Sequence, residues 1–270
     1  MKKIFIPVLT LLLSNTSFSQ NKLGEVACVY VTTTNLDSSV ALYEKLGLSM
    51  IASNTYPVPW AQVSDGALLV MMRKDDKPYI GLTYYTADIN STVEKLEKDS
   101  IVFTQKPKPG DAIQRYYFKS PDGLNIMLAQ NLGAFTQPTG KTLLTMKQDE
   151  YADAGKYPNK ELGVFGEFCH PVADLQKSLT FWKKLGFKVM GQMKEPYPHA
   201  ILSDGLMIIG LHQTDHFNYP AVTYFSVDTG KKLKALKDNA VKNLIPVMGE
   251  NNVVLKTWEG QNFFIFSMGM

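Results

Sequence analysis

The amino-acid sequence predicts an α+β protein of two tandem domains, each made of two modules with the order strand, helix and three strands. Residues 36–47 return as residues 175–186, and residues 59–66 return as residues 198–205, both at an offset of 139 residues. Each repeat also divides into two halves with the same order of strand-like and helix-like patterns. We infer that one domain was duplicated, so each functional position can be compared between two copies.

The first half of repeat one begins with a strand and a helix. Runs of β-branched and aromatic residues, bounded by Pro or by Ser-Asp-Gly, predict the strands. Apolar residues recur every three to four positions from Leu36 to Leu46, which is typical of a helix with one buried side. Asn35 or Asp37 is the expected N-cap, and Gly47 the expected stop. The expected strand, helix and three strands are residues 26–33, 36–46, 49–52, 60–64 and 67–72.

The remaining halves follow the same order, and a Ser-Pro-Asp-Gly turn at residues 120–123 separates the last two strands of repeat one. The second half of repeat one is expected at residues 80–85, a helix from 88, 101–104, 115–119 and 125–129. Repeat two is expected at residues 166–172, 175–185, 199–203, 207–211, 222–227, 232–236, 253–258 and 263–267. The predicted domains span residues 23–130 and 161–270, and a polar linker with one helical turn spans residues 131–160.

Residues 1–19 are typical of a secretory signal, because Lys2 and Lys3 precede an apolar stretch at 4–13 and small residues at 17 and 19. An apolar stretch of this length is too short to cross a bilayer, which needs about 20 residues. We therefore expect a secreted or periplasmic protein with no membrane partner. Without the signal, 26 basic and 25 acidic residues leave a net charge of +1, which predicts no nucleic-acid partner.

The chain has two cysteines, Cys28 and Cys169, in the first strands of the two repeats but at positions that do not correspond. An oxidising compartment would permit a disulfide between them. Two apolar strands in separate domains favour two buried thiols instead.

Both first-module helices and the Ser-Pro-Asp-Gly turn follow recognisable patterns. Residues 35–48 and 172–187 follow the pattern V-x-D-L-x-x-S-x-x-F-Y-x-x-L-G-F, and residues 120–123 are similar to D-P-D-G-N. These segments resemble the vicinal oxygen chelate superfamily, which includes glyoxalase I, bleomycin-resistance and fosfomycin-resistance proteins and extradiol dioxygenases. The resemblance implies that the modules of each domain curve into a half-barrel sheet, with helices outside and a ligand cleft inside.

The resemblance also implies where a metal ion would be bound, with one ligand on the first and one on the last strand of each module. A divalent ion needs three or four converging donors, which in this family means imidazole or carboxylate. Only one of the eight corresponding residues is a carboxylate, so we expect no metal and no cofactor. These residues are Cys28, Met71, Leu82 and Met127 in repeat one, and Glu167, Gly210, Val222 and Phe264 in repeat two.

Strand alternation suggests which side chains face the cleft. Trp60 and Gln62 share one side of their strand, where Trp60 would stack against a ligand. Tyr84 and Tyr224 are equivalent in the two repeats and are expected to line the clefts, with a place in the core as the alternative. Arg115 is expected to pair with an anionic ligand, with a solvated rim position as the alternative.

All four histidines lie in repeat two. Glu167 and His199 are candidates for a catalytic acid/base pair there, the alternative being a solvated histidine. His212 and His216 flank a turn and are expected in a polar surface loop.

Three functions remain open at this point. The favoured hypothesis is an exported protein that binds or sequesters a small, partly aromatic molecule, and the bleomycin-resistance branch of the resembled superfamily gives a precedent. The second is a glyoxalase-like lyase or a dioxygenase with an altered site around Glu167 and His199. The third is a degenerate scaffold for protein association, and a homodimer is left open.

Overall fold

We describe the protein from a computed structural model. The structure describes residues 22–133, 135–247, 249 and 251–268. The predicted signal segment, residues 1–19, lies outside these described residues.

Repeat one folds into a seven-stranded sheet with the order β2-β3-β4-β1-β5-β7-β6. The first strand lies at the centre, parallel to the last strand of its own module and antiparallel to the first strand of the next. The elements are β1 (Val26–Thr33), α1 (Leu36–Lys45), β2 (Ser49–Asn54), β3 (Trp60–Ser64), β4 (Leu69–Lys74), β5 (Ile80–Thr86), α2 (Ile89–Lys98), β6 (Arg115–Lys119) and β7 (Asn125–Gln130).

Repeat two repeats this arrangement in an eight-stranded sheet with the order β13-β14-β15-β12-β8-β11-β10-β9. Its elements are β8 (Val164–Pro171), α4 (Leu175–Lys184), β9 (Lys188–Met193), β10 (His199–Ser203), β11 (Ile208–His212), β12 (Ala221–Ser226), α5 (Thr229–Asp238), β13 (Leu244–Pro246), β14 (Val253–Lys256) and β15 (Asn262–Ser267). The segment between the sheets holds α3 (Gln148–Tyr151) and the short 3-10 helix η1 (Ala154–Lys156). The predicted α+β class with paired modules is confirmed.

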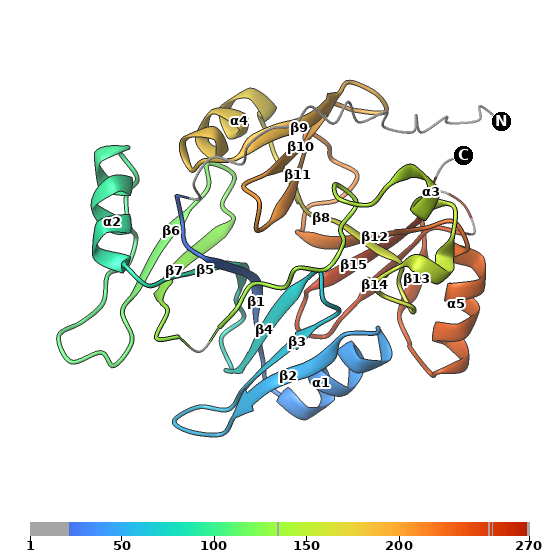
Figure 1. Ribbon diagram of the computed structural model, residues 1–270, viewed down its shortest axis with the longest axis horizontal. Coiled ribbons are helices and arrows are strands. Elements are labelled where there is room, and N and C mark those ends of the chain that lie inside the picture. The colour runs from blue at the N-terminus through green and yellow to red at the C-terminus, as the bar shows by residue number, and fades with distance from the viewer. Residues whose placement is uncertain (1–21, 134, 248, 250, 269–270) are drawn as a thin grey trace.

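The helices lie around the outside of the molecule in Figure 1. The first helix of each repeat begins at a side-chain cap, where Asn35 accepts from Ser38 N (3.1 Å) and Asp174 accepts from Lys177 N (3.0 Å). Of the two caps predicted for α1, Asn35 is therefore the one used. No helix within the described part of the chain is long and apolar enough to span a bilayer.

Three strand predictions need correction. Residues 101–104 form no strand. They follow a left-handed residue, Ser100 (φ 63°), and their segment pairs with β6 through a single isolated bridge between Gln105 and Tyr117. The edge strands β9 and β13 were missed. β9 is short of fully buried residues, and β13 has only three residues, so neither carries a clear alternating pattern.

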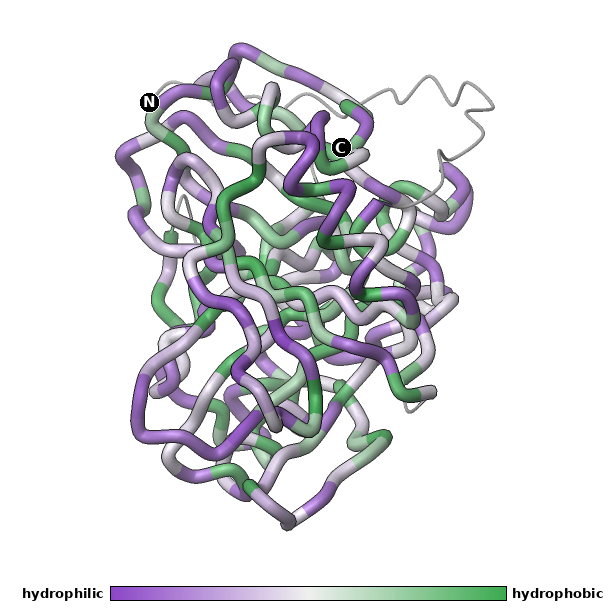
Figure 2. Tube along the Cα trace, turned by 90° about the vertical axis from the view of Figure 1, so that its left-hand side faces the viewer, coloured by the Kyte–Doolittle hydropathy of each residue, from purple (hydrophilic) through white to green (hydrophobic). Residues whose placement is uncertain are grey.

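Apolar side chains fill both faces of each sheet. The largest cluster lies on the helix side and includes buried residues of both repeats, and apolar segments run through the middle of the molecule in Figure 2. The opposite faces carry separate clusters around Cys28 and Cys169. We call them the Cys28 face (of the sheet of repeat one) and the Cys169 face (of the sheet of repeat two). Both cysteines are buried free thiols, as predicted.

Matching contacts join the two repeats. The hydroxyl of Tyr224 donates to Asp65 Oδ2 of repeat one (2.5 Å). In the reciprocal contact, the Asp204 carboxylate lies beside the hydroxyl of Tyr84 and helps burial to raise the pKa of that phenol. The two aspartates belong to the Ser-Asp-Gly segments that repeat in the sequence. In each repeat, the aspartate of the Ser-Asp-Gly segment therefore contacts a tyrosine of the other repeat, and the two tyrosines occupy equivalent positions.

Candidate functional site

Three of the predicted ligand-binding residues lie on the Cys28 face. Trp60 packs against its cluster, Gln62 pairs across the strands with Met71, and Arg115 pairs with Ala129. Directly paired residues point to the same side of a sheet. The structure therefore brings Trp60, Gln62 and Arg115 to one face, and their role in binding stays a prediction.

Tyr84 and Tyr224 do not lie on the Cys28 or Cys169 face, so of the two placements considered from the sequence the core is the one that the structure shows. Both are fully buried in the helix-side core. On β5 the residue paired with Cys28 is Thr83, and on β12 the residue paired with Glu167 is Thr223. The predicted alternation was displaced by one residue, which moves every side chain of a strand to the other face.

A group of tyrosines lies on the Cys28 face. Tyr79 stands edge-on to Tyr30 and to Tyr117, with ring centroids 5.6 and 6.3 Å apart. Burial raises the pKa of Tyr30 and of Tyr117, and the positive charges of Arg73 and Arg115 oppose this rise at both phenols. Arg73 also makes a side-chain hydrogen bond with Tyr30. Both guanidinium groups therefore act on the same two hydroxyls.

The Cys28 face also carries two buried polar side chains, Gln62 and Thr83. Gln62 is 3% exposed and Thr83 is fully buried. Within the described residues, Gln62 Nε2 and Thr83 Oγ1 have no hydrogen-bond partner. A buried polar group without a partner is costly, so both atoms are candidates for contact with a ligand. The sequence did not identify Thr83, because it was assigned to the other side of its strand.

On the Cys169 face, Glu167 is held by a histidine. Glu167 Oε1 lies 2.9 Å from His212 Nε2, and both side chains are largely buried. The ring of His199 is stacked parallel to that of His212 at 5.4 Å, and His199 Nδ1 lies 2.9 Å from the carbonyl oxygen of Tyr197. The partner of Glu167 is thus His212 rather than the predicted His199, and the acid/base role of the pair stays a prediction.

His212 does not lie in the surface loop predicted for it. It is the last residue of β11 and is 9% exposed, so the loop begins after it. His216 is exposed, as expected. The carboxylate of Glu167 lies over Gly210, where an added Cβ would stand 2.0 Å from Glu167 Oε2. Glycine at 210 is therefore what allows Glu167 to reach His212, a signal that is visible only once the strands are placed.

Buried histidines give repeat two a pH-dependent stability. Burial is the largest cause that lowers the pKa of both His170 and His199 below the ordinary value of 6.5. As the pH falls through about 6.5, the unfolded chain therefore takes up protons that the folded chain does not, so the free energy of unfolding decreases. Urea unfolding at pH 7.5 and 5.5 should show this loss. His170→Phe should reduce the loss, whereas the exposed-site control His216→Gln should leave it unchanged; equal losses in both variants would contradict this account.

No protein-family model matches the sequence, and no curated protein matches it. Solved structures do match. Homoprotocatechuate 2,3-dioxygenase from Arthrobacter globiformis is 15% identical, with a TM-score of 0.57, over 94% of this chain and 83% of that chain. The chain has the vicinal oxygen chelate fold.

Two further solved structures are similar to this chain over most of its length. The 2,3-dioxygenase LapB from Pseudomonas sp. KL28 is 14% identical (TM-score 0.56, 92% of this chain and 94% of that chain). The 2,2',3-trihydroxybiphenyl 1,2-dioxygenase from Sphingomonas wittichii strain RW1 is 13% identical (TM-score 0.55, 92% and 91%). At these identities the likeness establishes the vicinal oxygen chelate fold and leaves the function to be argued from the residues.

The strand pairing shows which residues occupy the metal-ligand positions that the resemblance implies, and on which face of each sheet they lie. Within the described residues, no three His, Cys, Asp or Glu side chains form a group that could hold a metal ion. Burial raises the pKa of the Cys28 thiol to about 12, so the group is a neutral thiol at ordinary pH. With the corrected alternation, the residues are Cys28, Met71, Thr83 and Met127 on the Cys28 face, and Glu167, Gly210, Thr223 and Phe264 on the Cys169 face.

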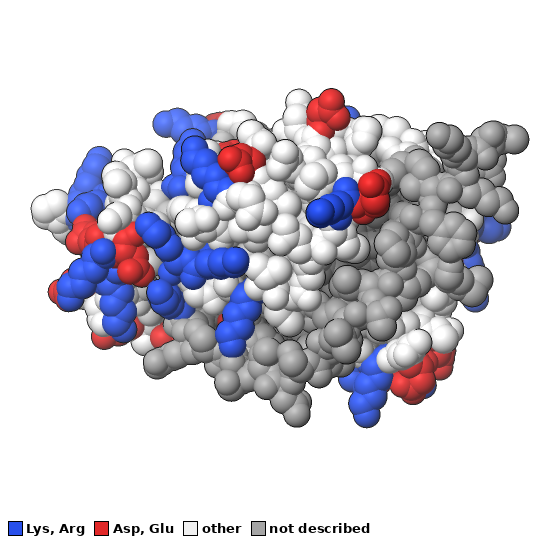
Figure 3. Space-filling view, turned by 90° about the horizontal axis from the view of Figure 1, so that it is seen from above, with Lys and Arg blue, Asp and Glu red and all other residues white. Residues whose placement is uncertain are grey.

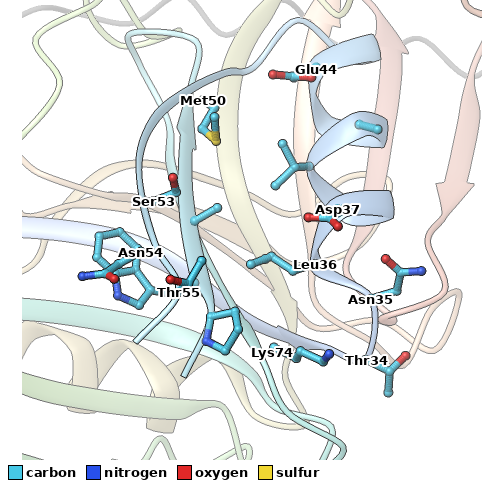
Figure 4. Close-up of a pocket in the computed structure, with 15 residues that line it drawn as sticks. Thr34, Asn35, Leu36, Asp37, Glu44, Met50, Ser53, Asn54, Thr55 and Lys74 are labelled. Carbon is cyan, nitrogen blue, oxygen red and sulfur yellow. The ribbon is translucent and has the colours of Figure 1, made fainter. Parts of the chain in front are cut away.

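A separate pocket of about 740 Å³ lies between α1 and the β2–β3 edge of the first sheet. Figure 4 shows Asp37 and Glu44 on the helix side of this pocket, and Ser53 and Asn54 on the strand side. Its lining mixes both charges with neutral groups, and acidic and basic side chains are likewise interspersed on the face shown in Figure 3. Nothing in this pocket selects one class of ligand.

Proposed function

We propose that the protein is an exported small-molecule-binding protein that holds an aromatic ligand on the Cys28 face without a metal ion. The observation that carries this proposal is the chemistry at the four metal-ligand positions of that face. They hold one neutral thiol, two thioethers and one hydroxyl, a set that does not fit a divalent ion that prefers imidazole and carboxylate.

The same face has the features of an organic binding site. Tyr30, Tyr79, Tyr117 and Trp60 offer aromatic surface, and thioethers make favourable contacts with aromatic rings. The unpartnered atoms of Gln62 and Thr83 offer hydrogen bonds. Small-molecule sites combine an apolar wall with a few such polar groups.

The catalytic alternative has less support. A glyoxalase-like lyase or a dioxygenase would need further donors beside Glu167, and the facing Thr223 and Phe264 supply neither imidazole nor carboxylate. The lowered pKa of His199 keeps its imidazole neutral and able to accept a proton, but the adjacent His212 and Glu167 are already engaged with each other at 2.9 Å. We therefore keep binding as the proposed function.

Elemental analysis combined with a thermal-shift assay tests the proposal. We expect purified protein to contain no stoichiometric zinc, nickel, manganese or iron, and its melting temperature to rise with benzoate, phenol or another simple aromatic probe in the presence of a chelator. Trp60→Ala should reduce this rise, whereas Trp258→Ala, which changes an exposed tryptophan of repeat two, should retain it. One bound metal ion per chain, or no stabilisation by any probe, would overturn the proposal.

A further inference from the structure

We infer that the ligand of the Cys28 face is an aromatic carboxylate, whose negative charge is held by Arg73 and Arg115. This inference rests on the proposed function and specifies the class of ligand. It comes from where the arginines lie, from the lack of an ion pair to either of them among the described residues, and from a comparison between the two repeats.

The whole chain contains 28 basic residues, and only two of them, Arg73 and Arg115, are arginines. They come from strands β4 and β6, which are separated in the sheet by β1, β5 and β7. Nevertheless both act on the hydroxyls of Tyr30 and Tyr117. Arginine is the side chain best suited to bind a planar carboxylate through two parallel hydrogen bonds.

Neither arginine forms an ion pair with an acidic residue in the described part of the chain. Within the described residues, every ion pair involves a lysine or a histidine, and none involves Arg73 or Arg115. Both arginines are half-buried. Two like charges in a partly dehydrated place repel each other more strongly than in water. The Asp111 carboxylate also acts on Tyr117, but it forms no ion pair with either arginine, so an anion bound directly by both would relieve part of this cost.

Repeat two shows what balances the equivalent position. At the offset of 139 residues, Arg73 corresponds to His212 and Cys28 corresponds to Glu167. In repeat two these two residues form the 2.9 Å pair between imidazole and carboxylate. Repeat one has a permanent cation in place of the histidine and a thiol in place of the carboxylate. The carboxylate that repeat two carries internally is therefore the group that repeat one lacks and that a ligand would supply.

The body of the ligand would then meet the tyrosines and the buried donors. Gln62 Nε2 and Thr83 Oγ1 lie on the same face as the arginines and are without partners among the described residues. The tyrosine rings next to Arg73 suit a flat aromatic ring. An aromatic carboxylate satisfies the charge, the surface and the donors together.

Isothermal titration of the full chain with benzoate and with neutral benzamide tests this inference. We expect benzoate to bind at least about tenfold more tightly than benzamide, and Arg73→Gln and Arg115→Gln each to weaken benzoate at least about tenfold while leaving benzamide unchanged. Lys74→Gln and Lys119→Gln, which change exposed lysines on the same strands, should have little effect.

The double variant Cys28→Glu/Met71→Gly provides a second arm, because it places an internal carboxylate where repeat two has Glu167 and the glycine that repeat two has at Gly210. We expect it to abolish benzoate binding in folded protein, whereas the matched Cys28→Ser/Met71→Gly variant should retain it. If benzamide binds as tightly as benzoate and the arginine variants bind like wild type, the ligand is neutral; the carboxylate inference then fails while the proposed function stands. If no probe binds, both fail.

Discussion

Gly163→Ala is expected to destabilise the protein by at least about 3 kcal/mol. Gly163 has a φ of 114°, and a Cβ at this position would stand 2.2 Å from the carbonyl oxygen of Phe225. Gly163 directly precedes β8, and the Phe225 carbonyl belongs to the backbone of β12, which pairs with β8. Neither the added Cβ nor this carbonyl could move without shifting the backbone at the centre of the sheet. Equilibrium unfolding in urea measures the loss. The equivalent Gly24 has the same constraint, with Tyr85 O at 2.3 Å.

Gly123→Ala is the matched control. Gly123 also has a left-handed φ, of 86°, but no atom lies within 4 Å of an added Cβ. Its substitution should cost only the backbone strain of about 1–2 kcal/mol. Equal losses in the two variants would show that the close approach between the strands is not what requires glycine at position 163.

Glu167→Ala is expected to cost about 3 kcal/mol, because it leaves a buried imidazole without the partner that satisfies it. The side chains of Glu167 and His212 are only 6% and 11% exposed, so water cannot readily replace the lost contact. Unfolding in urea at neutral pH gives the magnitude, and the exposed-site variant Glu195→Ala should remain within about 0.5 kcal/mol of wild type.

A double-mutant cycle separates the pair from the cavity that the Glu167 substitution creates. We expect Glu167→Ala and His212→Phe to be strongly non-additive, with a coupling of about 1–3 kcal/mol. Simple addition of the two losses would mean that the contact between carboxylate and imidazole contributes nothing to stability.

Much of the fold could be predicted because the duplicated pattern is local. β1 and β3 have the predicted bounds, and α1 ends one residue before the predicted end. The wrong or missing strand predictions lie where the local sequence pattern says little about strand boundaries. The segment 101–104, expected to be a strand, follows a left-handed residue, Ser100, and the edge strand β13 is too short to show alternation.

The candidate sites were predicted less well, because a site depends on which side of a strand each residue faces. An error of one position in β5 moved Tyr84 to the wrong face and hid Thr83. His212 was assigned to a loop, since the end of β11 cannot be located to one residue from sequence. Arg73 was overlooked, although counting arginines apart from lysines would have shown that there are only two.

The two repeats differ in the charged residues at equivalent positions of their sheets. Repeat two pairs its buried carboxylate with an imidazole of the same repeat, and Phe217 packs against His212 and Phe264 beside this pair. Repeat one keeps two arginines without acidic partners among the described residues, and a group of tyrosines beside them. On this account only the first repeat binds a ligand, and the second has a structural role.

Titration calorimetry of benzoate into chelator-treated protein, repeated after addition of iron(II), manganese(II) or zinc(II), tests the central claim of metal-independent binding most directly. We predict one binding event per chain, with the same affinity before and after metal is added. Binding that appears only once a metal ion occupies the protein would contradict the account.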